Sequence, residues 1–187
     1  MMPEEIVSKS ERYRTYFGTE GGITLSGGEP LLQADFAADI FRLCKERGIH
    51  TCLDTSGSIL NENVKKLLSV TDRILLDLKY STDEQYREYV GCGIDAPLQF
   101  LEYADSQKIP VTLRQVIIPT LNDTEHSIEF LNRIKERYSS VDGIELLPFR
   151  KICAVKYQKL GIPFRFESFD TPTAEEMNAL QSLLETK

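Results

Sequence analysis

The chain has 187 residues, of which 41% are hydrophobic and 27% charged, a composition typical of one globular domain. Its formal net charge is −7 and it contains no run of Lys and Arg, which argues against a nucleic acid partner. No apolar stretch reaches membrane-spanning length, and the acidic start Met2-Pro3-Glu4-Glu5 does not resemble a signal peptide. We therefore expect a cytoplasmic protein that does not enter a membrane.

Short aliphatic segments alternate with amphipathic ones along the whole chain. The aliphatic segments are rich in Val, Ile and Leu, as parallel strands buried on both faces should be. Repeated strand–helix units predict an α/β fold with a parallel sheet, either open or curled into a partial barrel. The predicted strands are 23–25, 49–54, 73–78, 110–118 and 143–147.

The predicted helices fill the gaps between these strands. The first leads the chain at 3–17, and a second carries the apolar face Leu32, Phe36, Ile40, Leu43 and Cys44 and ends at Gly48. Shorter helices are predicted at 61–69 and 97–107. Asn122 or Asp123 is expected to cap the next helix, and Thr173 with Glu176 forms a capping box that opens the last one.

The segment Gly27-Gly28-Glu29-Pro30 follows the first predicted strand directly. Glycines allow a ligand to approach the backbone closely, and Glu29 offers a carboxylate to a cationic group. Pro30 fits the first turn of a following helix. The segment predicts a ligand-binding corner at the carboxyl end of the sheet, and a plain tight turn is the alternative.

Charged residues also mark the ends of the later strands. Asp54 ends the second predicted strand, Asp77 and Lys79 end the third, and Arg114 lies inside the fourth. Because carboxyl ends of parallel strands meet at one rim, these residues and Glu29 are expected to share a pocket for a zwitterionic or cationic ligand. The alternative is an internal salt-bridge network that joins Asp77 to Lys79 and Arg114 to Asp54.

The four cysteines show no spacing typical of a metal or cluster site. Cys44 and Cys52 lie in apolar segments and are expected to be small buried hydrophobic residues. Cys92 lies between two glycines in a predicted loop, and Cys153 lies near the C-terminal third. A disulfide framework is not expected.

Four segments, in this order, resemble the pyruvate formate-lyase-activating enzymes of the radical S-adenosylmethionine (SAM) superfamily. They are Thr24-Leu25-Ser26-Gly27-Gly28-Glu29-Pro30, Cys52-Leu53-Asp54-Thr55-Ser56-Gly57, Leu76-Asp77-Leu78-Lys79 and Leu146-Leu147-Pro148-Phe149. The resemblance extends from about Ile6 to the C-terminus. It implies a single radical SAM domain over 1–187, a partial TIM-like (β/α) barrel with about five of the family's six βα units.

The resemblance also implies the activity. Such enzymes cleave SAM reductively with a [4Fe-4S] cluster and produce a glycyl radical on a partner, pyruvate formate-lyase or a relative. A flavodoxin or ferredoxin-type protein is the implied reductant.

Site roles follow where the motifs match. Gly27, Gly28 and Glu29 resemble the loop that receives the amino group of SAM. Asp54, Thr55 and Asp77 resemble a group near the methionine carboxylate that can hold a monovalent cation. The catalytic roles fall to Lys79 and Arg114, which resemble basic residues facing the reacting centre, and Arg150 could bind a carboxylate.

The sequence departs from the family at two places. The CxxxCxxC motif that binds the cluster is absent, together with the strand before it, so we expect the 187 residues to be an N-terminally truncated piece that is inactive alone. Arg150 stands where the family usually has a histidine. A cluster-less SAM-binding or regulatory module is the alternative function, and a phosphate-binding α/β enzyme is a weaker one.

Overall fold

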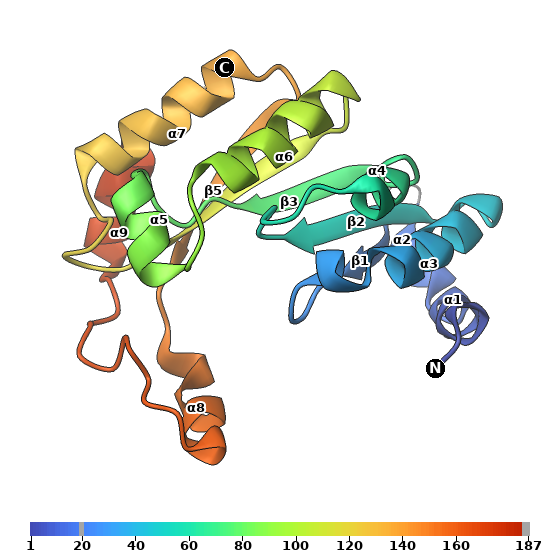
Figure 1. The fold of residues 1–187 in the computed structure, drawn as a ribbon, viewed down its shortest axis with the longest axis horizontal. Coiled ribbons are helices and arrows are strands. Elements are labelled where there is room, and N and C mark those ends of the chain that lie inside the picture. The colour runs from blue at the N-terminus through green and yellow to red at the C-terminus, as the bar shows by residue number, and fades with distance from the viewer. Residues whose placement is uncertain (19–20, 185–187) are drawn as a thin grey trace.

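Five parallel strands form the centre of the computed structural model, which describes residues 1–18 and 21–184. They are β1 (Gly22–Leu25), β2 (His50–Thr55), β3 (Arg73–Asp77), β4 (Val111–Ile117) and β5 (Val141–Pro148), and their order across the sheet follows the chain (Figure 1). The sheet does not close on itself. The expected α/β fold with a partial barrel of parallel strands is therefore confirmed.

Along the described chain, helices precede, connect and follow these strands. None of them is long and apolar enough to cross a membrane, among the residues that the structure describes. Their bounds are α1 (Pro3–Glu11), α2 (Arg14–Phe17), η1 (Pro30–Gln33), α3 (Ala34–Glu46), α4 (Glu62–Leu68), α5 (Asp83–Tyr89), α6 (Asp95–Ser106), α7 (Glu125–Arg137), η2 (Lys151–Cys153), α8 (Ala154–Leu160) and α9 (Ala174–Ser182).

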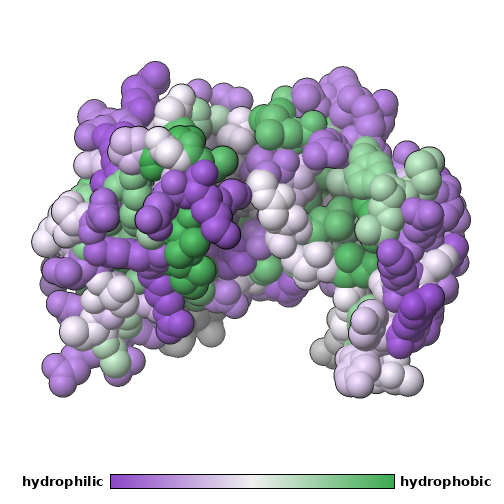
Figure 2. All heavy atoms as spheres, turned by 90° about the horizontal axis from the view of Figure 1, so that it is seen from below, coloured by the Kyte–Doolittle hydropathy of each residue, from purple (hydrophilic) through white to green (hydrophobic). Residues whose placement is uncertain are grey.

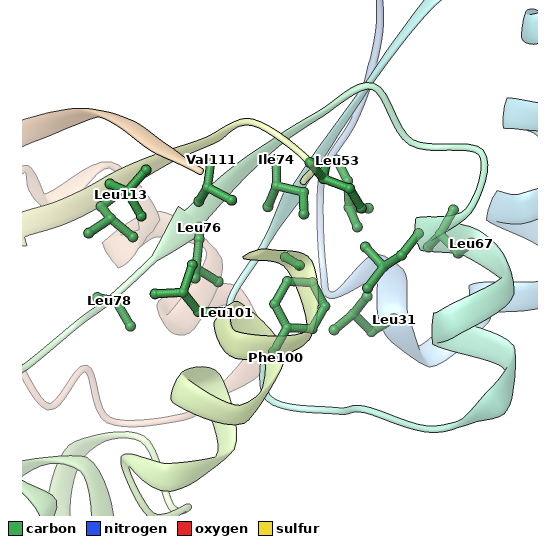
Figure 3. Close-up of a cluster of buried hydrophobic side chains, with 14 of the residues drawn as sticks. Leu31, Leu53, Leu67, Ile74, Leu76, Leu78, Phe100, Leu101, Val111 and Leu113 are labelled. Atoms are coloured by element: carbon green, nitrogen blue, oxygen red, sulfur yellow. The ribbon is translucent and has the colours of Figure 1, made fainter. Parts of the chain in front are cut away.

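The two faces of the sheet differ sharply in burial. Successive side chains of a strand point to opposite faces, so β3 alternates between half-buried and fully buried residues. The fully buried face packs on the helices, where Leu53, Ile74, Leu76 and Val111 surround Phe100 of α6 (Figure 3). The other face of the sheet, which carries the half-buried residues, is the one that presents the polar side chains.

Gly22 of β1 fixes how closely the first two strands approach. A Cβ at this position would lie 1.9 Å from the main-chain oxygen of His50, well inside any allowed contact. No other residue type fits there without moving β1 away from β2. The close approach of β1 to β2 at this position therefore requires a residue without a side chain.

Two expected caps behave differently. The capping box of Thr173 and Glu176 is confirmed at α9. The expectation for α7 was wrong, because Thr124 caps it through Ser127 N–H. Asn122 is instead fully buried and binds the main chain of neighbouring loops.

The expected apolar face before Gly48 was wrong at its first two positions. Leu32 is 72% exposed and Phe36 is also exposed, whereas Ile40, Leu43 and Cys44 are buried. Leu32 lies in the short turn η1, outside α3, so the helical periodicity does not extend to it. Phe36 lies in the first turn of α3 and lines an open cavity beside the Gly-Gly corner. The leading segment is likewise two helices, α1 and α2, and the short helices α5 and α8 were not anticipated.

Candidate functional site

Arg114, in the middle of β4, links that strand to the carboxyl ends of β2 and β3. Its register partner on β3 is Asp77, and its Nη2 and Nε atoms lie 2.8 and 3.0 Å from Asp77 Oδ1. The same guanidinium also contacts the carboxylate of Asp54 at the end of β2. The Arg114–Asp54 pair of the alternative network is thus present, but Arg114 bridges both acids. The salt bridges of the described chain include none between Asp77 and Lys79.

Burial and ion pairing both shift the pKa values of the groups in this cluster. The Arg114 side chain is only 15% exposed. Burial raises the pKa of the Asp77 carboxyl, and the attraction of Arg114 only partly offsets this. Burial alone would lower the pKa of Arg114, but the charges of Asp77 and Asp54 outweigh it and the pKa is raised. The cluster therefore combines a guanidinium whose pKa is raised with a carboxyl group whose pKa is also raised.

Glu29 forms a second polar cluster with the loop after β2. Its Oε1 accepts from the Thr55 hydroxyl at 2.6 Å, and its Oε2 accepts from Ser56 N–H at 3.0 Å and Ser56 Oγ at 2.6 Å. It also accepts from Leu31 N–H at the start of η1. The carboxylate thus ties the corner after β1 to the corner after β2.

The Gly-Gly corner is open on its outer side. Gly27 and Gly28 adopt φ angles of +85° and +58°, and no atom lies within 4 Å of a Cβ built at either. Both glycines, with Glu29, line a cavity of about 360 Å³ that continues along Leu32 and Phe36. Positive φ angles strongly favour glycine, so the Gly27-Gly28 pair is explained by the backbone conformation of the corner as well as by the open space beside it.

A larger cavity of about 510 Å³ lies beyond the ends of β3, β4 and β5. It brings together four of the residues singled out in the sequence: Asp77, Lys79, Arg114 and Arg150. Gly27, Gly28 and Glu29 line the separate cavity described above. Asp54 is not among the residues that line the large cavity, but it forms an ion pair with Arg114, which is. The buried Thr55 donates its hydroxyl to Glu29.

Aromatic side chains supply much of the wall of this large cavity, and the sequence reasoning missed them. Tyr80, Tyr89, Tyr157, Phe164 and Phe166 line it. Neighbouring rings contact each other, as the Tyr89 and Phe166 rings do with centroids 5.9 Å apart. The signal available in the sequence was the density of aromatic residues after the third and fifth strands.

Buried polar side chains hold Lys79 in position, and these too were missed. The Lys79 N–H donates to Tyr86 Oη at 3.0 Å, and its main-chain oxygen accepts from Asn122 Nδ2 at 3.1 Å. Gln115 donates to the Leu78 oxygen next to it at 3.0 Å. Gln115 is the one amide within an aliphatic strand, which was a usable signal. The Lys79 side chain itself is exposed at the cavity.

The described cysteines do not fit a [4Fe-4S] cluster. Cys44 is buried in α3, Cys52 is half-buried on β2, Cys92 follows α5 and Cys153 ends η2. Full burial of Cys52 was expected and is wrong, because its side chain faces the open side of the sheet. Nowhere in residues 1–18 and 21–184 do three or more His, Cys, Asp or Glu side chains gather as a metal site.

The expected cation site is also differently arranged. Asp54 and Asp77 share Arg114, which supplies positive charge between them, and the hydroxyl of Thr55 is engaged by Glu29. The two carboxylates therefore bind Arg114 while the Thr55 hydroxyl binds Glu29, so the oxygen atoms of the three residues do not converge on one point.

Comparison with known proteins places the chain in a family. Residues 1–131 match the family model of the Radical SAM superfamily. The pyruvate formate-lyase-activating enzyme of Clostridium pasteurianum is 37% identical over 182 residues, which cover 97% of this chain and 76% of that protein. The pyruvate formate-lyase 1-activating enzyme of Escherichia coli (strain K12) is 35% identical over 185 residues, with 97% and 75% covered.

A solved structure shares the fold. A domain of pyruvate-formate lyase-activating enzyme from Bacteroides vulgatus ATCC 8482 superposes with a TM-score of 0.70 at 23% identity, covering 87% of this chain and 92% of that one. The family match over residues 1–131 and the identities with two activating enzymes carry the assignment. This chain belongs to the radical SAM superfamily and, within it, to the pyruvate formate-lyase-activating enzymes.

Proposed function

We propose that this chain binds SAM at the mouth of its sheet and acts as the SAM-binding body of a glycyl-radical-enzyme activase. The observation that carries the proposal is the meeting of Asp77, Lys79, Arg114 and Arg150 around one aromatic-lined cavity of about 510 Å³. A cavity of this size with few polar groups is typical of small-molecule sites. The family membership narrows the ligand to SAM.

The groups around the cavity match the parts of SAM. Its methionine carboxylate needs cationic donors, which Lys79, Arg114 and Arg150 offer. Its ammonium and sulfonium need acceptors, and Asp77 offers a carboxylate while Glu29 stands at the Gly-Gly corner. The aromatic walls provide flat surfaces for adenine. A monovalent cation is not part of this proposal, since Arg114 already balances Asp54 and Asp77.

The fuller activity proposed is formation of a glycyl radical on pyruvate formate-lyase or a relative, with electrons from a flavodoxin or ferredoxin-type reductant. This activity depends on a [4Fe-4S] cluster in the family. Because the described residues do not form a cluster site, we assign to them only the binding and orientation of SAM.

Calorimetry with SAM tests the binding proposal. Lys79→Ala should weaken SAM binding about tenfold or more, the loss expected for a charge-assisted hydrogen bond. Lys66→Ala is the matched control, because Lys66 is an exposed lysine on α4 away from the cavity. Equal affinity for SAM in Lys79→Ala and the wild-type chain would contradict the assignment.

A non-catalytic SAM-binding module is the second candidate, because the same side chains around the cavity would bind SAM without a cluster. Anaerobic iron–sulfur reconstitution of the full-length gene product that contains this chain separates the two. Four iron and four sulfide per chain after desalting, with a glycyl radical signal by electron paramagnetic resonance when pyruvate formate-lyase is added, would support the enzyme. SAM binding without either would support the module.

A further inference from the structure

A short segment of the chain combines exposed apolar side chains with positive charge. We define residues 150–166, which comprise η2, α8 and the turn after them, as the basic arm. In Figure 1 the α8 part of this arm extends away from the body of the molecule. Four of its aliphatic side chains are 52% to 80% exposed: Ile152, Val155, Leu160 and Ile162. A contiguous group of exposed apolar side chains often marks an interaction surface, whereas single scattered ones do not.

The charge of the basic arm opposes that of the rest of the chain. It holds five Lys and Arg residues and no Asp or Glu. Since the whole chain has a formal net charge of −7, the chain without the arm carries −12. Figure 2 looks at the molecule from below, the side toward which α8 extends, and shows hydrophobic spheres beside strongly hydrophilic ones.

Most of these positive charges are uncompensated. Within the described chain, Arg150, Lys156 and Lys159 take part in none of the salt bridges, and Lys151 donates to the main-chain oxygen of Glu167. Only Arg165 has a carboxylate partner, Glu88 of α5 at 2.9 Å. Unpaired cations on a surface are free to meet acidic groups of another molecule.

Two contacts fix the arm to the body, so its surface is presented in one position. The guanidinium of Arg165 lies 4.4 Å from the centre of the Tyr89 ring. The Phe164 ring packs against Phe149 of the body, with centroids 6.4 Å apart. The arm is therefore held by α5 and by the end of β5.

The same arm forms one wall of the candidate SAM cavity. Arg150, Ile152, Cys153 and Tyr157 line that cavity together with Asp77 and Lys79. A protein that docks on the arm is thereby placed at the mouth of the cavity. This is the position that a protein substrate of the site must occupy, whereas a second copy of the chain would block it.

We propose that the basic arm is the docking surface for the protein substrate, and that it fits an acidic surface of that partner that also exposes apolar side chains. The inference rests on the proposed function, because it takes the substrate to be a glycyl radical enzyme. Apolar contacts supply affinity and the lysines supply orientation and a fast approach.

Binding of purified pyruvate formate-lyase to the chain, measured by biolayer interferometry in the presence of SAM, tests the proposal. The double variant Lys156→Glu/Lys159→Glu should weaken binding about tenfold or more and reduce its dependence on salt. The control Lys66→Glu/Arg133→Glu makes the same change in charge on exposed positions of α4 and α7 and should bind as the wild type does. Leu160→Ser should weaken binding, whereas Tyr16→Ser, also at an exposed residue, should not.

Several outcomes would overturn the docking proposal. The first is an equal loss of affinity for pyruvate formate-lyase in the arm and control variants. The second is self-association of the wild type, measured by light scattering, that the arm variants abolish. The third is binding of the arm to anionic phospholipid vesicles or duplex DNA but not to pyruvate formate-lyase. SAM affinity measured on the same samples separates the two proposals. If the wild type binds SAM but the arm variants bind pyruvate formate-lyase normally, only the docking proposal is refuted. If the wild type does not bind SAM, the proposed function is refuted as well.

Discussion

The carboxylate of Glu29 accepts a 2.6 Å hydrogen bond from the hydroxyl of Thr55, across the gap between the first two strand ends. The bond makes Glu29 a structural link in addition to a candidate ligand group. The two corners that frame the mouth of the sheet therefore depend on one side chain.

Glu29→Ala should destabilise the chain as well as change its ligand binding. Loss of the carboxylate leaves Thr55, Ser56 and Leu31 without this acceptor, and a hydrogen bond to a charged group contributes about 1.5–3 kcal/mol net of the competing bonds to water. We expect a loss of about 2–3 kcal/mol in the free energy of unfolding, measured by urea denaturation without SAM. Glu29→Gln keeps one acceptor and should lose less. An unchanged unfolding midpoint in Glu29→Ala would show that these bonds are replaced by water at no cost.

Arg114→Met should leave two carboxylates facing each other without a cation. We expect a destabilisation of about 2–4 kcal/mol near neutral pH, in the range found when one partner of a largely buried pair is removed. Adding Asp77→Asn to this variant should recover part of the loss, because one of the two repelling charges is removed. Thermal unfolding of Arg114→Met, Asp77→Asn and the double variant measures the coupling. Additive losses in the double variant would mean that Arg114 and Asp77 contribute independently.

The acids of the chain should respond to pH in opposite senses. Burial raises the pKa of Asp72, but hydrogen bonds from Lys45 and Thr51 outweigh it and the pKa is lowered below 3.8. Its contribution to stability is therefore present above pH 3.8 and is lost as the pH falls through the folded-state pKa. Asp77 has a raised pKa, so its contribution is present below pH 3.8 and is lost as the pH rises through the higher folded-state pKa.

Unfolding free energies of Asp72→Asn and Asp77→Asn relative to wild type, measured from pH 3 to 7, check these directions. The cost of Asp72→Asn should shrink as the pH falls. The cost of Asp77→Asn should shrink, or turn into a gain, as the pH rises. Parallel pH profiles for the two variants would contradict the opposite pKa directions.

Asn122→Leu should be among the most destabilising single changes in the chain. The side chain is fully buried, accepts from Ile118 N–H at 2.7 Å and donates to the main-chain oxygens of Val116 and Lys79. Leaving these buried groups unpaired should cost about 3–5 kcal/mol. The exposed Asn178→Leu on α9 is the control and should change stability by at most about 0.5 kcal/mol. Comparable midpoints for the two variants in urea would remove the structural role given to Asn122.

The sequence predicted the fold well because each strand and most of the longer helices carry their own local signal, which the short helices α5 and α8 lack. Aliphatic runs identified all five strands to within a few residues, and the motif order identified the family. Leu32 misled the helix assignment, since it lies in a 3-10 turn before α3, where the helical periodicity does not apply. The spacing of apolar residues gives no sign of such a turn.

The site was harder to predict than the fold. Asp54, Asp77 and Arg114 could be expected to approach each other because parallel strand ends meet at one rim. Which acid Arg114 would bind, and that Glu29 would bind Thr55, depends on the direction of each side chain in space. The aromatic walls come from segments far apart in the sequence, such as α5 and the basic arm, and no local pattern connects them.

Every strand of the sheet has its chain neighbour as its spatial neighbour, from β1 through β5. Each βα unit can therefore dock on the one made just before it, without waiting for a distant partner. Low sequence separation between contacting elements favours rapid folding, and growth in one direction suits a chain that emerges from the ribosome. The five strands are therefore synthesised in the order in which they lie side by side, and all of them precede the basic arm in the chain.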